Sequence, residues 1–194
     1  TFFGTVLAAS GAAVFNQLME VESDARMHST SDRPLPAKRL PKPAAFILGW
    51  LLAGFGLVHL GVKVNAPASI MAGATLLTYL FVYTPLKRVS AFAVVPGSLI
   101  GALPPAIGWT AAGGSVADPS VLALAFVFFI WQVPHFWLLV GLHAEGYEEA
   151  GYPTLVSVFG RPRLSRLTFT WTCGTAAACG LLPMFRVLVS WPAE

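Results

Sequence analysis

The stretch "TFFGTVLAASGAAVFNQLMEVESDARMHSTSDRPLP", residues 1–36, joins an apolar run to a polar end. Its first 19 residues carry no charged side chain, yet carboxylates and arginines follow at once. A run of ~20 apolar residues is the length that crosses a hydrocarbon core as a helix. The stretch therefore predicts a membrane-spanning helix with a polar cluster at one end.

The remainder of the chain repeats this apolar pattern. Of 194 residues, 56% are hydrophobic and 11% are charged, whereas about 25% are charged in a typical soluble domain. Apolar stretches cover roughly residues 1–19, 43–62, 66–84, 91–112, 119–142 and 167–190. We therefore expect an all-α fold, a polytopic transmembrane bundle of six spans that forms a single domain over residues 1–194.

The charged residues indicate an orientation in the lipid bilayer. Of the 12 Lys and Arg residues, ten lie in three segments, residues 26–42, 87–88 and 161–166, which six consecutive spans would place on one membrane face. The positive-inside rule makes this face cytoplasmic in a bacterial inner membrane, or the matrix face in a mitochondrial one. Most acidic residues belong to the same face, so it has more than an orienting role. No nucleic-acid partner is expected.

Three oxygen-bearing side chains follow one another at helical spacing where the first apolar run ends. Asn16, Glu20 and Asp24 occupy positions i, i+4 and i+8, which drift by only about 40° around a helix. Such a sparse stripe suits Mg²⁺, which prefers few carboxylates together with substrate phosphates and water. The alternative interpretation is a solvated helix end at the membrane interface.

A second polar cluster, "YTPLKR", ends the third apolar run on the same face. Tyr83 and Lys87 are one helical turn apart, and Arg88 follows. An interfacial aromatic residue with ordinary positive anchors would explain them equally well. Together with the first cluster, however, they fit a diphosphate bridged by Mg²⁺ and held by cations.

A third cluster, "HAEGYEEAGYPTL", follows the fifth apolar run. Glu145 and Glu149 are one turn apart if the helix continues, Tyr147 lies between them, and "AGYP" then breaks the helix. The alternative is a plain acidic loop. Within the fifth run, His135 in "WQVPHFW" is an ionisable residue at membrane depth, either a heme ligand or a neutral histidine bonded between helices.

These motifs resemble those of a known family. "NQLMEVESDARMHSTSDRPL" resembles the N-x-x-x-[DE]-x-x-x-D motif of the UbiA-type intramembrane prenyltransferases, and "YTPLKR" is similar to their Y-x-x-x-K motif. "GALPPAIGW", "WQVPHFW" and "Y…AGYPTL" resemble the branch formed by the protoheme IX farnesyltransferases, or heme O synthases. That family folds into nine transmembrane helices, so the resemblance implies that this chain corresponds to helices two to seven, without the first and the last two.

The resemblance also implies roles for the residues of the three clusters. Asn16, Glu20 and Asp24 would hold Mg²⁺ against the diphosphate of farnesyl diphosphate, and Glu145 and Glu149 would hold a second Mg²⁺. Glu20, Asp24 and Lys87 would be the catalytic residues. The further substrate-binding residues would be Arg33, Tyr83, Arg88, Tyr147 and His135.

The implied activity is transfer of the farnesyl group to a vinyl group of heme b, giving heme O for terminal oxidases. Its partners would be farnesyl diphosphate, heme b, the lipid bilayer and, as candidates, heme–copper oxidase assembly proteins. The chain has Ser29 where the family motif usually has Arg, and Gly146 where it usually has Asp. Two alternatives therefore stay open, namely a non-catalytic accessory or heme-handling subunit of a membrane complex, and a prenyltransferase for a quinone precursor.

Overall fold

The computed structural model describes residues 1–185 and 187, and every regular element among them is a helix. A π-helical segment, η1 (Tyr79–Tyr83), joins α3 to α4, and a 3₁₀ turn, η2 (Leu182–Phe185), follows α8. The α-helices are α1 (Phe2–Asp24), α2 (Lys42–Lys63), α3 (Ala66–Thr78), α4 (Thr84–Leu86), α5 (Val94–Ala111), α6 (Pro119–Leu142), α7 (Ala144–Glu149) and α8 (Leu155–Leu181).

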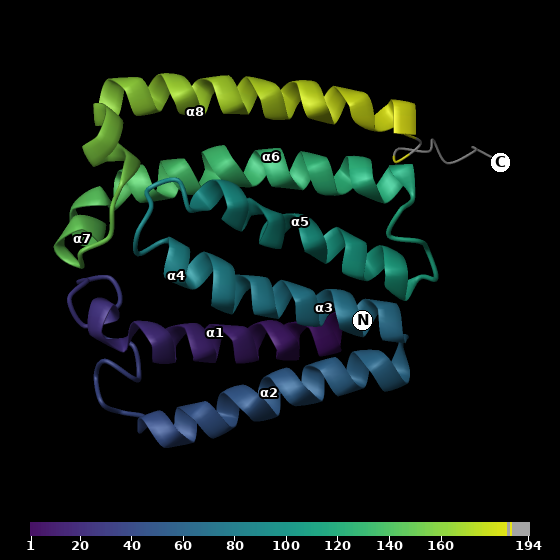
Figure 1. Cartoon of the computed structure of the whole chain (residues 1–194), viewed down its shortest axis with the longest axis horizontal. Coiled ribbons are helices and arrows are strands. Elements are labelled where there is room, and N and C mark those ends of the chain that lie inside the picture. Colours follow the sequence, from purple (N-terminus) through teal and green to yellow (C-terminus); the bar gives the residue numbers. More distant parts are fainter. Residues whose placement is uncertain (186, 188–194) are drawn as a thin grey trace.

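The long helices lie side by side with their axes roughly parallel to one direction (Figure 1). α1 packs chiefly on α2, α3 contacts both α2 and α5, α5 packs on α6, and α6 packs on α8. Among the described residues, five helical runs are long and apolar enough to cross a membrane: α1, α2, residues 66–86, α5 and α6. The predicted polytopic all-α bundle is therefore confirmed, with these five spans close to their expected bounds.

The sixth expected span, residues 167–190, falls on α8. This helix begins at Leu155, earlier than predicted, and runs through Gly160, whose backbone is not helical (φ 72°, ψ 157°). Arg161, Arg163 and Arg166 lie in its first half, which lowers its apolar character, and α8 is not among the five spans found. Part of the expected span, residue 186 and residues 188–190, lies outside the described residues.

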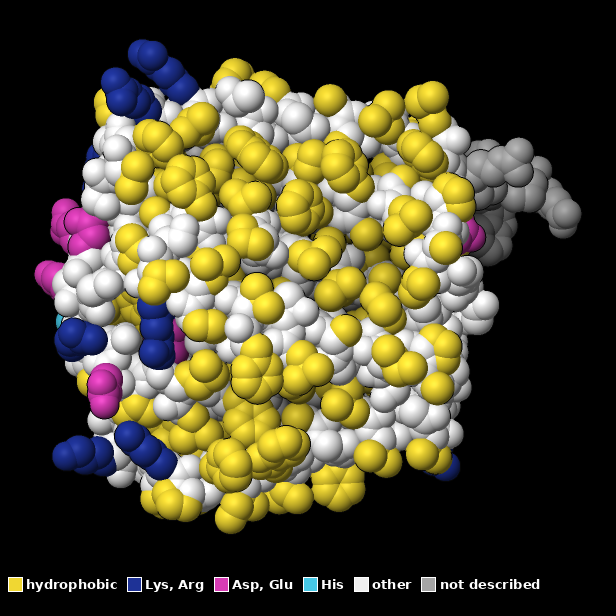
Figure 2. Space-filling view, in the orientation of Figure 1, with side chains coloured by type: hydrophobic (Ala, Val, Ile, Leu, Met, Phe, Trp, Pro, Cys, Tyr) yellow, Lys and Arg dark blue, Asp and Glu magenta, His cyan; other side chains and the backbone are white. Residues whose placement is uncertain are grey.

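The bundle has large side chains outside and small ones inside. Exposed residues include Phe46, Trp50, Phe55 and Phe81, whereas much of the buried interior is alanine. Figure 2 shows apolar side chains over the flank of the molecule and most cations at the end where α1 stops and α2 starts. This distribution suits a protein whose flank faces lipid. In lipid the hydrophobic effect does not hold helices together, and small residues let the helices pack closely instead.

The contact between α1 and α2 is particularly close because glycines face each other there. A Cβ atom placed on Gly11 would lie 2.5 Å from the backbone nitrogen of Ala53 and 2.7 Å from its Cβ. One stripe of α1, including Gly4, Ala8 and Ala12, is buried, and the same stripe continues into Asn16, Glu20 and Asp24. Packing of the small residues thus fixes the rotation of α1 that turns the polar residues inward.

From this contact we predict that an alanine substitution changes stability very differently at two glycines. Gly11→Ala should destabilise the protein by about 1–3 kcal/mol, since the new methyl group overpacks the interface with backbone that cannot move away. Gly54→Ala in α2 should be neutral or slightly stabilising, because nothing lies within 4 Å of its Cβ position and Ala favours a helix. Unfolding in mixed micelles measures both; equal effects would contradict the assigned packing.

Candidate functional site

The three polar residues of α1 lie inside the protein. Asn16, Glu20 and Asp24 are 5%, 3% and 4% exposed. A helix end that is merely solvated at the interface would leave these side chains in water, so that alternative is excluded. Burying two carboxylates is costly unless each is paired and hydrogen-bonded, and the structure supplies partners for both.

Glu20 is the centre of the polar cluster. Lys87 Nζ donates to Glu20 Oε2 at 2.7 Å, and Asn16 Nδ2 donates to the same oxygen at 2.5 Å. The Tyr152 hydroxyl donates to Glu20 Oε1 at 2.9 Å. The Lys87 ammonium also lies 5.6 Å from the ring centroid of Tyr83 and 5.7 Å from that of Tyr152. Residues from three distant parts of the sequence therefore converge on one carboxylate.

Asp24 is paired with a cation from the segment that follows α1. Arg33 Nη1 donates to Asp24 Oδ2 at 2.9 Å, and the Thr30 hydroxyl donates to the Asp24 backbone carbonyl at 2.9 Å. These bonds fold residues 25–33 back over the end of α1. In the described part of the chain no side chain donates to Asp24 Oδ1, which leaves that oxygen available to a ligand.

Sequence reasoning missed Tyr79, which belongs to this cluster. Its hydroxyl donates to Asn16 Oδ1 at 2.7 Å, and its ring stacks on Tyr83 with centroids 5.9 Å apart. Tyr79 begins the π-helical segment η1, where Thr84 donates to its backbone carbonyl at 2.9 Å. The signal was present in the sequence, because Tyr79, Tyr83 and Lys87 follow one another at intervals of four residues.

α7 and the loop after it cover the polar cluster. Met27, Ala150 and Tyr152 form a small buried apolar cluster against which Tyr147 packs. The chain reverses at Gly151, whose φ of +85° is unfavourable for other residues. Burial raises the pKa of Tyr152 to about 12, with Glu20 adding to the shift, and burial likewise raises the pKa of Tyr147. Both phenols therefore stay protonated and can donate hydrogen bonds at neutral pH.

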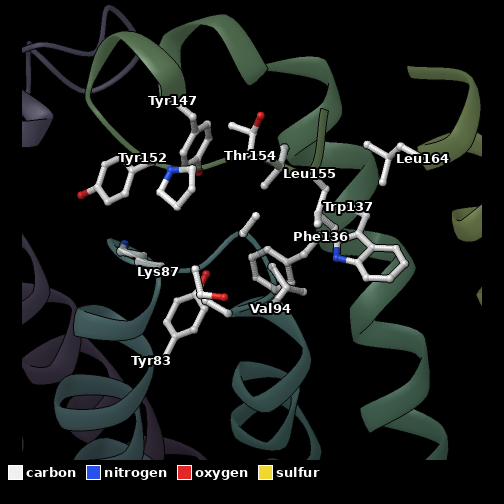
Figure 3. A pocket seen from close by; sticks show the side chains of 15 residues that line it. Tyr83, Lys87, Val94, Phe136, Trp137, Tyr147, Tyr152, Thr154, Leu155 and Leu164 are labelled. Carbon is white, nitrogen blue, oxygen red and sulfur yellow. The ribbon is translucent and has the colours of Figure 1, made fainter. Parts of the chain in front are cut away.

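A pocket opens beside Lys87 and changes character along its length (Figure 3). Its polar end is formed by four side chains: Tyr83, Lys87, Tyr147 and Tyr152. Its other end is apolar and is lined by Val94, Phe136, Trp137, Leu155 and Leu164. The Trp137 side chain is buried, and its Nε1 has no hydrogen-bond partner among the described residues. An unpaired buried donor is uncommon in folded proteins, and this one lies on the wall of a cavity.

Four other predicted site residues lie elsewhere. Arg88 is exposed, donates to the Met19 carbonyl and does not line this pocket. Glu145 and Glu149 share α7, as expected, but both are exposed, and no three His, Cys, Asp or Glu side chains gather anywhere in residues 1–185. His135 is exposed on α6 and stacks on Trp131, with centroids 4.8 Å apart. Their roles in binding a second Mg²⁺, diphosphate or heme stay predictions.

Similarity to known proteins identifies the family of this chain. The profile of the UbiA prenyltransferase family matches residues 1–193. The chain belongs to this family. It is 41% identical over 186 residues to a protoheme IX farnesyltransferase of Geobacter sulfurreducens, covering 95% of this chain and 68% of that relative.

Further relatives carry the same name. The chain is 39% identical over 182 residues to a protoheme IX farnesyltransferase of Oleidesulfovibrio alaskensis, covering 94% of this chain and 64% of that protein. It is 42% identical over 156 residues to one from Aquifex aeolicus, covering 80% of this chain and 53% of that protein. The chain thus spans between half and about two thirds of these relatives. No solved structure matches it.

The Lys87–Glu20 pair predicts a clear double-mutant result. Lys87→Met should cost about 3 kcal/mol of stability, because it leaves a buried carboxylate without its cation. Lys87 is 21% exposed, which puts the expected loss at the low end of the range for buried pairs. Adding Glu20→Gln to Lys87→Met should recover most of the loss, since the uncompensated charge is then gone.

The exposed Arg39–Asp32 pair, whose side chains are 58% and 92% exposed, is the matched control. Arg39→Met should change stability by less than about 1 kcal/mol. Chemical unfolding in micelles at neutral pH measures all four proteins. A loss of similar size in the two single variants, or no recovery in the double variant, would show that Lys87 does not neutralise a buried Glu20.

Proposed function

We propose that this chain transfers a farnesyl group from farnesyl diphosphate to a vinyl group of heme b, with Mg²⁺ bound at the polar stripe of α1. One structural observation carries the proposal: the buried stripe of oxygen ligands is bonded through Glu20 to Lys87 and Tyr152, which line a pocket that is polar at this end and apolar at the other. A prenyl diphosphate has the same polarity, an anionic head on a hydrocarbon tail. The choice of farnesyl as the group transferred and of heme as its acceptor rests on the names of the relatives.

The residues of the stripe fit Mg²⁺. Asn16, Glu20 and Asp24 offer carboxylate and amide oxygens from one helix face, the hard donors that Mg²⁺ prefers, and they leave room for water and phosphate in its shell. When bound, Mg²⁺ would neutralise charge on the diphosphate. Lys87 and Arg33, which now contact these carboxylates, are long enough to turn toward phosphate oxygens when the metal takes over the carboxylates.

The pocket walls would hold further parts of farnesyl diphosphate. Tyr83 and Tyr147 line its polar end beside Lys87, and their hydroxyls would donate to the diphosphate. Tyr152 lines the same end, and its hydroxyl donates to Glu20. The apolar end would take part of the prenyl chain.

The chemistry needs no protein nucleophile. The allylic C–O bond of farnesyl diphosphate breaks, and its electron pair leaves with the diphosphate toward Lys87 and Arg33. The vinyl π electrons of heme b then form the new C–C bond to the farnesyl carbon, and water adds to the resulting cation with loss of a proton. The residues contribute by stabilising the charge that develops on the departing group, which is usually a large catalytic effect.

Other parts of the proposal rest on the family resemblance. Glu145 and Glu149 would serve a second Mg²⁺ from α7, Arg88 would assist at the diphosphate, and His135 would contact heme. The product would be heme O for terminal oxidases, with heme–copper oxidase assembly proteins as candidate partners. The cation-rich end of the bundle would face the cytoplasm, or the matrix in a mitochondrion, according to the positive-inside rule.

A test of activity uses membranes containing the full-length protein, supplied with heme b, farnesyl diphosphate and Mg²⁺. Mass analysis of extracted heme should show a product heavier by one farnesyl group plus water, and EDTA should abolish it. Asp24→Asn should lower the rate at least 100-fold, because loss of a metal-binding carboxylate exceeds the 10- to 100-fold cost typical of supporting groups.

The matched control is Glu22→Gln, which removes a carboxylate from the same helix on its exposed side. It should keep the wild-type rate. Unchanged heme in the presence of a folded, heme-binding wild-type protein would favour the accessory role instead. Full activity of the Asp24→Asn variant would overturn the metal assignment while leaving the family membership intact.

A further inference from the structure

A second recess lies on the bundle next to the proposed transferase pocket. The cationic recess is lined by residues of α1 and of the loop after α7 and by the charged side chains of Glu22, Arg26, Lys42 and Arg88. Three of these residues are cations and one is an acid, which gives the recess a net positive charge. In the described structure none of its cations forms an ion pair. Their charges are therefore available to an anion from outside the chain.

An apolar groove continues from this recess along the flank of the bundle. It is formed by α1, α2, α3 and η1, and its lining includes Leu18, Met19, Phe46, Gly54, Leu57 and Gly73. Leu18 and Met19 line both cavities, so the two adjoin. The groove contains almost no polar surface, whereas the recess is predominantly polar.

Two glycines keep the groove open. No atom lies within 4 Å of a Cβ placed on Gly54, and on Gly73 the nearest atom would be 3.9 Å away. Along α2 the groove runs from Phe46 to Leu57, a rise of ~16 Å at 1.5 Å per residue. Half of a hydrocarbon core of ~30 Å is about the same depth. The groove thus has the length of one leaflet.

We propose that the recess and the groove together bind one anionic phospholipid from the surrounding leaflet. Its phosphate lies between Arg26 and Lys42, and one acyl chain lies between Phe46 and Leu57. The net positive charge of the recess is complementary to an anion, and the apolar lining of the groove is complementary to a long hydrocarbon chain. A free phosphate would leave the groove empty, and a zwitterionic lipid would leave the net charge uncompensated. This site is separate from the transferase pocket, although Tyr152 lines both cavities.

The experiment counts lipids retained by the full-length protein in native mass spectrometry. The probes are phosphatidylglycerol and phosphatidylcholine with identical acyl chains. The wild type should retain one phosphatidylglycerol in preference to phosphatidylcholine. Arg26→Gln with Lys42→Gln should lower that preference roughly 10-fold or more, because each basic residue near an anionic headgroup contributes about a factor of five.

Two matched controls test whether the results come from this site, and not from any loss of positive charge or any added large side chain. Arg163→Gln with Arg166→Gln removes the same charge from the first half of α8 and should leave the preference unchanged. Gly54→Leu should displace the retained lipid by filling the groove, whereas Gly174→Leu, at another position with open space around its Cβ, should not.

Three results would overturn the proposal. These are equal retention of the two lipids by the wild type, an unchanged preference in the Arg26/Lys42 double variant, and displacement of phosphatidylglycerol by an equimolar amount of farnesyl diphosphate. The last result would make the groove a prenyl diphosphate site. None of these three results depends on turnover, so the proposed transferase activity is tested separately.

Discussion

Burial of a charged carboxylate in a membrane protein is the constraint on which the site depends. Glu20 is nearly inaccessible to solvent and receives hydrogen bonds from Asn16, Lys87 and Tyr152. In a medium of low dielectric constant an unpaired carboxylate would be neutralised or would unfold the site. The partners come from α1, from the segment after α4 and from the loop after α7. Pairing one carboxylate therefore fixes the relative positions of three parts of the bundle.

The small residues of the α1–α2 contact serve the same arrangement. Gly4, Ala8 and Ala12 bury one face of α1, and Asn16, Glu20 and Asp24 extend that face by whole turns. If the glycines and alanines were larger, α1 would have to rotate or move away from α2, and the carboxylates would lose their partners. The buried stripe of α1 thus has the small packing residues along its first half and the candidate site along its second half.

The polar stripe and most of the spans were predictable from the sequence, because a regular helix places residues at intervals of four on one face and a span needs a long apolar run. Asn16, Glu20 and Asp24 were expected on one face, and runs of apolar residues located the spans of α1, α2, α5 and α6. Spacing could group Tyr79 with Tyr83 and Lys87, but it could not predict the contacts of Tyr79 and Tyr152 with the α1 stripe, since these join residues more than 60 positions apart. Sequence reasoning also placed the start of the last helix too late, because three arginines interrupt the apolar pattern near the beginning of α8. The exposed positions of Glu145, Glu149 and His135 depend on how α6 and α7 are rotated, which local spacing does not determine.

If the buried stripe of α1 binds a metal-bound diphosphate, anomalous scattering from a bound metal ion will show the ion there. A crystal of the full-length protein with Mn²⁺ in place of Mg²⁺ and a non-reactive thiodiphosphate analogue of farnesyl diphosphate would be required. We predict an anomalous peak at coordination distance, about 2.1 Å, from oxygens of Glu20 or Asp24, with Lys87 turned toward the diphosphate. A peak elsewhere, with Glu20 still bonded to Lys87 and Asp24 to Arg33, would mean that the stripe does not bind the metal.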